Sequence, residues 1–432
     1  MRKNKFLLIT FILFSLIKSL ASLEYSDIYA DVSEFFSVFI DPNEGLTSFR
    51  SLLIPSGGRP EALGNAYTGM ANDLSYIEYN PAASAVLDET EIGVFHNAWI
   101  LDTNVESFVF TSRKRNLGWG AQIKALYLPF TEYDLFGNSV SAGYYSETIA
   151  AINLAYNFFA GYTFKGLAVG TSLKTAFRSV PDYVNAETDQ IDKNAGLGQS
   201  GLAFMADLGF LFRFNAFKFY SSREANMQVG LSFMHFGAGI TGFAQADGVF
   251  LDDPLPSKIN LGFSYKPIRP LTFVADISQP LNLQSIGESG LLSFGGGMAL
   301  QITPFFALHS GFFLSGGNPR FSLGSEFMLF SYLANVNYTL DLTSSINPIS
   351  RFSLALKMNL GDKGRKSDAE KVDELYVKGL EAYYLLHLEE AIRLWEEALE
   401  IDPGFDPAII AIKAAQATID IQEKIRDIQK LE

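Results

Sequence analysis

A run of about ten residues that alternates apolar with small or polar side chains recurs fourteen times between residues 91 and 360. Clear copies lie at 226–233, 258–265 and 352–360, and turns separate the runs. An alternation with period two gives a β-strand one apolar face and one polar face. The recurrence therefore predicts an all-β domain of about 14 antiparallel strands over residues 91–360.

The N-terminus reads as a signal peptide over residues 1–21. A basic head (2–5) precedes an apolar stretch (6–17), and small residues at 19–21 offer a cleavage site. A retained membrane anchor is the alternative, but the apolar stretch is short for that and Lys18 interrupts it. Because only a closed barrel leaves no unpaired strand edge in lipid, secreted strands of this kind predict a transmembrane β-barrel in the bacterial outer membrane.

A soluble β-sandwich would also show alternating strands. Two observations favour the barrel. The strand lengths stay near what a tilted crossing of a bilayer needs, and aromatic residues collect near strand ends, as at a membrane interface. Long links follow odd-numbered strands and short turns mostly follow even ones, although the link at 215–225 is longer than this rule expects. The pattern predicts external loops at one end and periplasmic turns at the other.

Composition excludes several classes of function. The chain has no cysteine, so it holds neither a disulfide nor a thiolate metal site. Its net charge of −14 argues against nucleic acid as a partner. The four histidines, His96, His235, His309 and His387, fall in separate elements and form no catalytic or metal-binding motif. We expect no enzyme activity, no catalytic residues, no metal and no cofactor.

A lumen of fourteen strands needs either water or a plug, because it is wider than the lumen that side chains fill in an eight-stranded barrel. Residues 22–90 have apolar and turn-forming residues but no strand pattern of their own. We expect this segment to be a plug, or hatch. The remaining divisions are a linker at 361–371 and a helical domain at 372–432.

The stretch 49–83 resembles the long-chain fatty-acid transporters of the outer membrane (FadL) and their PorV-type relatives. The elements that carry the resemblance are Gly58-Arg59, Leu63-Gly64-Asn65-Ala66, Met70-Ala71-Asn72-Asp73 and Asn80-Pro81-Ala82. The resemblance implies a barrel of fourteen strands plugged by an N-terminal hatch, with Asn80, Pro81 and Ala82 where hatch meets wall. A purely structural role, closing the barrel floor, is the alternative for these hatch residues.

Two predicted loops are more apolar than a solvated loop should be, and such clusters often mark binding grooves. We expect a hydrophobic small-molecule ligand to bind there, unless the loops only pack on each other. The candidate substrate-binding residues are Phe130, Tyr133, Leu135, Phe136, Phe243, Phe250 and Leu251. Inward-facing charges could pair with a ligand head group or with hatch carboxylates; these are Lys124, Lys174, Arg320, Glu326 and Lys357.

After residue 361 the composition becomes helical and acidic, with 17 Asp and Glu against 10 Lys and Arg. Five residues match the 34-residue tetratricopeptide pattern; they are Gly379, Ala391, Trp395, Ala398 and Pro403. We expect further helices at 407–417 and from about 421 to the end. The domain is either a solvated helical surface in the periplasm or a module that binds a periplasmic protein.

These features support two hypotheses from different classes. The first is passive uptake of hydrophobic small molecules, with long-chain fatty acids as the expected substrate. The second is a PorV-type scaffold that exports proteins or anchors them at the surface. The apolar loops favour transport and the helical domain favours the scaffold. Outer-membrane lipid is an expected partner in either case.

Overall fold

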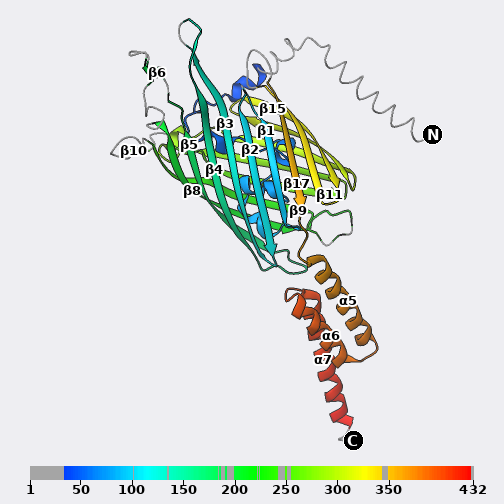
Figure 1. Ribbon diagram of the computed structural model, residues 1–432. Coiled ribbons are helices and arrows are strands. Elements are labelled where there is room, and N and C mark those ends of the chain that lie inside the picture. Colours follow the sequence, from blue (N-terminus) through cyan, green and yellow to red (C-terminus); the bar gives the residue numbers. More distant parts are fainter. Residues whose placement is uncertain are drawn as a thin grey trace, which may run out of the picture.

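The structure is a computed structural model that describes residues 34–429 except 101, 134–135, 183, 186–189, 192–198, 221, 223, 242–248, 251–253 and 343–348. The predicted signal peptide (1–21) lies outside the described residues. Strands wind into a tilted barrel, helices extend from one end, and described residues that precede β1 lie inside the barrel (Figure 1). We call the end that carries the helices the helical end, and the opposite one the far end.

The barrel strands are β1 (Glu91–Ala98), β2 (Asn104–Lys114), β3 (Leu117–Tyr133), β4 (Ser139–Phe158), β5 (Leu167–Ser179), β8 (Gly201–Phe214), β9 (Met227–Thr241), β11 (Ser257–Ile268), β12 (Leu271–Leu281), β13 (Ser293–Thr303), β14 (Phe306–Ser315), β15 (Asn318–Leu329), β16 (Tyr332–Asp341) and β17 (Ile349–Asn359). Short strands in the connections are β6 (Val184–Asn185), β7 (Gln190–Ile191) and β10 (Val249–Phe250). The helical elements are η1 (Ser37–Phe39), η2 (Arg50–Leu53), α3 (Arg59–Ala62), η3 (Leu74–Glu78), η4 (Pro81–Ala85), η5 (Ile286–Glu288), α5 (Arg365–Tyr384), α6 (Leu388–Ile401) and α7 (Asp406–Gln429).

The sheet closes on itself. It contains 15 strands, of which β10 pairs only with β9, so 14 strands form the wall, and all their pairings are antiparallel. Glu91 at the start of β1 pairs with Asn359 at the end of β17. The prediction of a closed barrel of fourteen strands is confirmed, and both ends of the barrel sequence return to the helical end.

One predicted loop is largely strand. Residues 128–146 were expected to form a long link, but β3 continues to Tyr133 and β4 begins at Ser139, with Phe130 opposite Gly143. Aromatic and β-branched residues in this stretch suit a strand as well as an apolar loop, and the ladder of the neighbouring strand extends through them. The result is a two-stranded ribbon that projects beyond the far end (Figure 1).

The wall is apolar outside and polar inside. On β4 and β5 the outward side chains Ile152 and Leu173 are 70% and 68% exposed, whereas their inward neighbours Asn153 and Lys174 are 1% and 4% exposed. A soluble protein has the opposite arrangement, because exposing apolar side chains to water raises the free energy of the folded state. The fold is therefore that of an outer-membrane β-barrel. No helix in the described ranges has the length and apolar character needed to cross a membrane.

Residues 48–87, which we call the lumen segment, fill much of the barrel interior. Tyr67, Leu74, Tyr76 and Ile77 have no exposed surface, and they belong to one apolar cluster with wall residues such as Val109. The segment contains short helical turns rather than long elements, which leaves its backbone free to follow the wall (Figure 1). It enters from the far end and reaches the helical end at residue 87.

Helices α5, α6 and α7 pack around Trp395, which is 1% exposed. A Cβ at Gly379 would lie 2.2 Å from the indole nitrogen of Trp395, so only glycine fits there. Two expectations change. The stretch predicted as a linker already contains the start of α5 at Arg365. The two helices predicted after residue 406 are the single helix α7, because no glycine or proline follows Pro407 at its start.

The helical unit touches the barrel rim at several points. Tyr162 in the β4–β5 turn makes an edge-to-face contact with Phe405, and the backbone N–H of Thr163 donates to Asp406 at 3.1 Å. Lys366 forms an ion pair with Glu89 at 2.6 Å. These contacts fix the unit beneath the turns of the helical end.

Candidate functional site

Two local structures shape the lumen segment around its polar residues. The Asp73 side chain caps η3 by accepting from the N–H of Ser75 at 2.9 Å, and the Asn80 side chain caps η4 by accepting from Ala82 at 3.1 Å. Pro81 occupies the first position of η4, where a missing N–H costs nothing. Asp73 and the Asn-Pro-Ala element thus build the turns that the sequence indicates.

Asn80 also joins the segment to the wall. Its amide nitrogen donates to the carbonyl of Thr68 within the segment and to the carbonyl of Phe210 on β8, both at 3.0 Å. Gly64 lies against β14, where a Cβ would be 2.2 Å from the Phe312 carbonyl oxygen. The lumen segment therefore lies close to the wall at both positions, through a side chain at Asn80 and through backbone at Gly64.

A buried charge network holds the middle of the segment. The Arg59 guanidinium contacts both carboxylate oxygens of Glu326 on β15, at 2.7 Å each, and lies 3.8 Å from Asp73. Lys357 on β17 pairs with Asp73 at 2.5 Å. Burial raises the pKa of the Asp73 carboxyl, but Lys357 and Arg59 outweigh it and hold that pKa well below its ordinary value. Asp73 is thus an anion in the lumen.

The inward charges expected from the sequence all have partners. Lys124 pairs with Glu78 of the lumen segment at 2.9 Å, and Lys174 and Arg320 pair with wall carboxylates at 2.6 Å and 2.9 Å. The remaining two, Glu326 and Lys357, belong to the network around Arg59. None of these five charges is free to bind a ligand head group.

Asp276 on β12 holds a second part of the segment. One of its carboxylate oxygens accepts from the backbone N–H groups of Tyr67 at 2.9 Å and Thr68 at 2.7 Å. Beside it Gly69 lies on Gly262 of β11, where a Cβ on Gly69 would be 2.7 Å from the Gly262 carbonyl. No side chain separates the segment from the wall at this contact.

A cavity of about 510 Å³ lies above this contact, toward the far end, between the lumen segment and the wall of β11 to β15. Part of its lining is apolar, namely Leu46, Leu52, Leu53, Ile54, Trp99 and Phe313. The cations Arg50 and Arg320, which also line it, pair with Glu44 and Asp341. We call it the far-end cavity.

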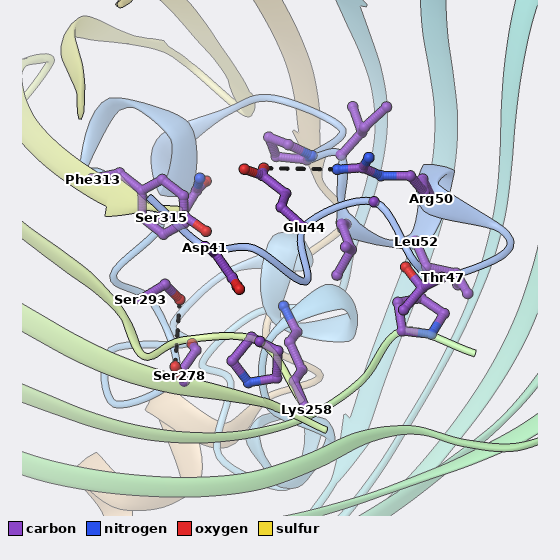
Figure 2. A pocket seen from close by; sticks show the side chains of 18 of the residues that line it. Asp41, Glu44, Thr47, Arg50, Leu52, Lys258, Ser278, Ser293, Phe313 and Ser315 are labelled. Atoms are coloured by element: carbon purple, nitrogen blue, oxygen red, sulfur yellow. Dashed lines mark hydrogen bonds and ion pairs between the residues drawn. The ribbon is translucent and has the colours of Figure 1, made fainter. Parts of the chain in front are cut away.

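Lys258 on β11 is the exception among the cations of this cavity. Its ammonium points into the cavity (Figure 2) and, within the described part of the chain, has no carboxylate within 4 Å and no hydrogen-bond acceptor. A cation next to apolar side chains is the arrangement that an amphiphilic anion needs. The alternation of β11 places Lys258 on the polar face with Asn260, Gly262 and Ser264, so the pattern contains the signal, but only the fold shows that Lys258 lacks a partner.

The predicted substrate-binding residues lie elsewhere. Phe130, Tyr133 and Phe136 are exposed on the projecting ribbon and do not line the far-end cavity. Phe250 is in β10, while Leu135, Phe243 and Leu251 fall outside the described residues. Their role stays a prediction. The residues of the predicted hatch motif all lie in the lumen segment; they are Gly58, Arg59, Gly64, Asn80, Pro81 and Ala82.

A closed wall of 14 strands, apolar outside and with a folded segment inside, defines a β-barrel of the outer membrane. Within that class the chain belongs to the uncharacterised protein family UPF0164, whose family model matches residues 28–363.

Among its relatives, a UPF0164 protein of Treponema pallidum (strain Nichols) is 30% identical over 394 residues, which cover 88% of this chain and 85% of the relative. Among solved structures, the chain is similar to the Pseudomonas putida toluene transporter TodX (TM-score 0.46, 10% identity, 69% of this chain and 96% of the other). It is also similar to a Pseudomonas aeruginosa FadL homologue (TM-score 0.44, 11% identity, 71% and 97%).

Proposed function

We propose that the protein is an outer-membrane channel for passive uptake of hydrophobic small molecules, and that its substrate is a long-chain fatty acid. The observation that carries the proposal is the far-end cavity, where the unpaired Lys258 stands beside apolar side chains. A carboxylate head group would pair with Lys258, and the acyl chain would lie against residues such as Leu52 and Phe313.

In this proposal the far end faces the medium and the helical end faces the periplasm. The turns at the helical end are mostly short, whereas several connections at the far end are long, as in barrels of this class. The lumen segment acts as the hatch. Because it lies between the far-end cavity and the helical end, it has to shift for a molecule to pass.

We expect Lys258→Met to weaken binding of dodecanoate by about 10-fold or more, because a charge-assisted hydrogen bond contributes about 1.5–3 kcal/mol. Binding of the uncharged dodecanol should stay the same, since the apolar lining is intact. The measurement is equilibrium binding of radiolabelled ligand to purified protein in detergent. The matched control is Lys413→Met, which removes an exposed lysine of α7. Equal loss of both ligands, or no loss of either, would contradict the assignment of Lys258.

A second function is favoured by the helical unit. Helix α5 presents Val377, Leu380 and Tyr384 along one face, and these residues are 51%, 41% and 86% exposed. Exposed apolar side chains at this spacing are typical of a helix that binds a partner. We propose that the tetratricopeptide-like unit binds a periplasmic protein, so that the barrel also serves as a scaffold, as in the PorV-type hypothesis.

We expect the double variant Val377→Asp, Tyr384→Asp to lose a periplasmic protein that co-purifies with the wild-type chain in stoichiometric amount. The charges would disrupt an apolar interface without disturbing the buried core around Trp395. The measurement is affinity purification from cells after crosslinking, with Lys413→Asp as a surface control of the same unit. A co-purified protein that survives the double variant, or none in the wild type, would reject the scaffold.

A further inference from the structure

The inner face of β11 carries a nearly symmetrical row of side chains. Lys258, Asn260, Gly262, Ser264 and Lys266 alternate with outward apolar residues, and the two lysines stand at opposite ends of the row. At a rise of about 3.3 Å per residue, they are roughly 26 Å apart along the strand. Lys258 and Asn260 line the far-end cavity, whereas Ser264 and Lys266 line a different one.

This second cavity, which we call the helical-end cavity, has a volume of about 310 Å³ and lies below the lumen segment. Met70, Ala71 and Asn72 form its roof on the segment side. The rest of its lining is mostly polar and includes three cations, Lys165, Arg213 and Lys266, and two carboxylates, Asp88 and Glu224. It is the more polar of the two cavities, with an excess of positive charge.

Two of these cations have capacity to bind an anion. Lys266 has no ion-pair or hydrogen-bond partner for its ammonium among the described residues. Arg213 donates from one terminal nitrogen to the carbonyl of Lys165 at 3.0 Å, while its buried Nε–H has no partner within the same residues. A buried donor without an acceptor costs about 1–3 kcal/mol, which a bound anion would recover.

The lumen segment at Thr68 to Met70 separates the two cavities along β11. Thr68 lines the far-end cavity and Met70 lines the helical-end cavity, so Gly69 stands between them. Gly69 rests on Gly262, in the middle of the row. Three hydrogen bonds hold the backbone before Gly69. The Asp276 carboxylate accepts from the N–H groups of Tyr67 and Thr68, and the Asn80 amide donates to the Thr68 carbonyl. Ion pairs attach the segment to the wall at other positions, namely Arg59–Glu326, Lys357–Asp73 and Lys124–Glu78, and none of them has to break for the backbone at Gly69 to move.

We propose that the helical-end cavity is a second binding site, for the anionic head group of the transported amphiphile, and that the inner row of β11 is the path between the two sites. This inference rests on the proposed function and adds the route to it. An anion that leaves Lys258 for a lumen without a second cation would pay a large desolvation cost. Lys266 and Arg213 on the other side of Gly69 reduce that cost. The head group is a carboxylate or a phosphate monoester, which share this chemistry.

The transport test uses proteoliposomes and follows entry of dodecanoate, dodecyl phosphate and dodecanol above the protein-free background. We expect Lys266→Gln to slow entry of the anionic ligands about 10-fold and to leave dodecanol unchanged. The control is Lys114→Gln, an exposed lysine at the same end of β2. A slower entry of only one anion would identify the head group. If Lys266→Gln has no effect while Lys258→Met still impairs binding, the second site is wrong and the proposed function stands.

A thiol test is independent of transport, because the chain has no cysteine of its own. Ser264→Cys places one thiol in the row. Ser322→Cys places one on β15 at a position that lines neither cavity. We expect an anionic methanethiosulfonate to modify Ser264→Cys at least 10-fold faster than a cationic one, and Lys266→Gln to abolish that preference. The Ser322→Cys variant should show no preference. Equal preferences at the two positions would overturn the anion path.

Discussion

Replacing Arg59 by alanine should loosen the lumen segment and raise the ion conductance of the barrel. The change leaves Glu326 and Asp73 buried without their guanidinium, and breaking a buried charge pair in this way costs about 3–5 kcal/mol. The Arg59→Lys variant should be almost as conductive as Arg59→Ala, because lysine cannot contact both carboxylate oxygens of Glu326 as the guanidinium does. Single-channel recording in planar bilayers measures the effect.

The matched control for this variant is Arg50→Ala. Arg50 is also an arginine near the start of the segment, but its pair with Glu44 is 3.8 Å long and half exposed, so its loss should cost about 0–1 kcal/mol. The two variants remove the same charge. Equal conductance for Arg59→Ala and Arg50→Ala would show that the charge network around Arg59 does not hold the segment.

The second large effect is expected for Gly64→Ala. Gly64 has φ +64°, and its new Cβ would lie 2.2 Å from the Phe312 carbonyl oxygen on β14. The left-handed backbone costs an L residue about 1–2 kcal/mol, and overpacking against a fixed strand adds about 1–3 kcal/mol. We expect the midpoint of urea unfolding in detergent to fall. The measurement is the fraction of folded protein, which gel electrophoresis separates from the unfolded form by its mobility.

The Gly137→Ala variant separates the cost of the left-handed backbone from the cost of the close contact with β14. Gly137, in the β3–β4 turn, has φ +83°, and a Cβ there has no atom within 4 Å. This variant therefore carries the backbone cost alone and should shift the midpoint less than Gly64→Ala. If the two variants shift it equally, close contact between Gly64 and β14 is not what seats the lumen segment.

The barrel itself could be predicted from local sequence because each strand carries its own alternation. Ile259, Leu261 and Phe263 face outward and Asn260 and Gly262 face inward on β11, as the pattern requires. Residues 128–146 were predicted as a loop but are largely strand, because aromatic residues suit both an apolar loop and a strand. In the C-terminal domain, the three- and four-residue spacing of apolar residues predicts two helices where the structure has the single helix α7, although the alanine-rich stretch at 414–417 favours helix throughout.

The candidate site could not be predicted in the same way. Alternation shows that Lys124, Lys258 and Lys357 all face inward, but not which of them stays unpaired. That depends on where the turns of the lumen segment place Glu78 and Asp73, which pair with Lys124 and Lys357 across 46 and 284 residues of sequence. Lys258 becomes a candidate only because no carboxylate of the segment reaches it.

The pairing of β1 with β17 has a consequence for biogenesis. The lumen segment is translated before any strand, yet it contacts strands on all sides of the cylinder, and the last seam joins Glu91 to Asn359. A compact segment with buried ion pairs cannot be threaded into a finished cylinder without first unfolding. Insertion of the strands and enclosure of their contents are therefore one event, and an assembly intermediate with an open seam would expose the segment to proteases.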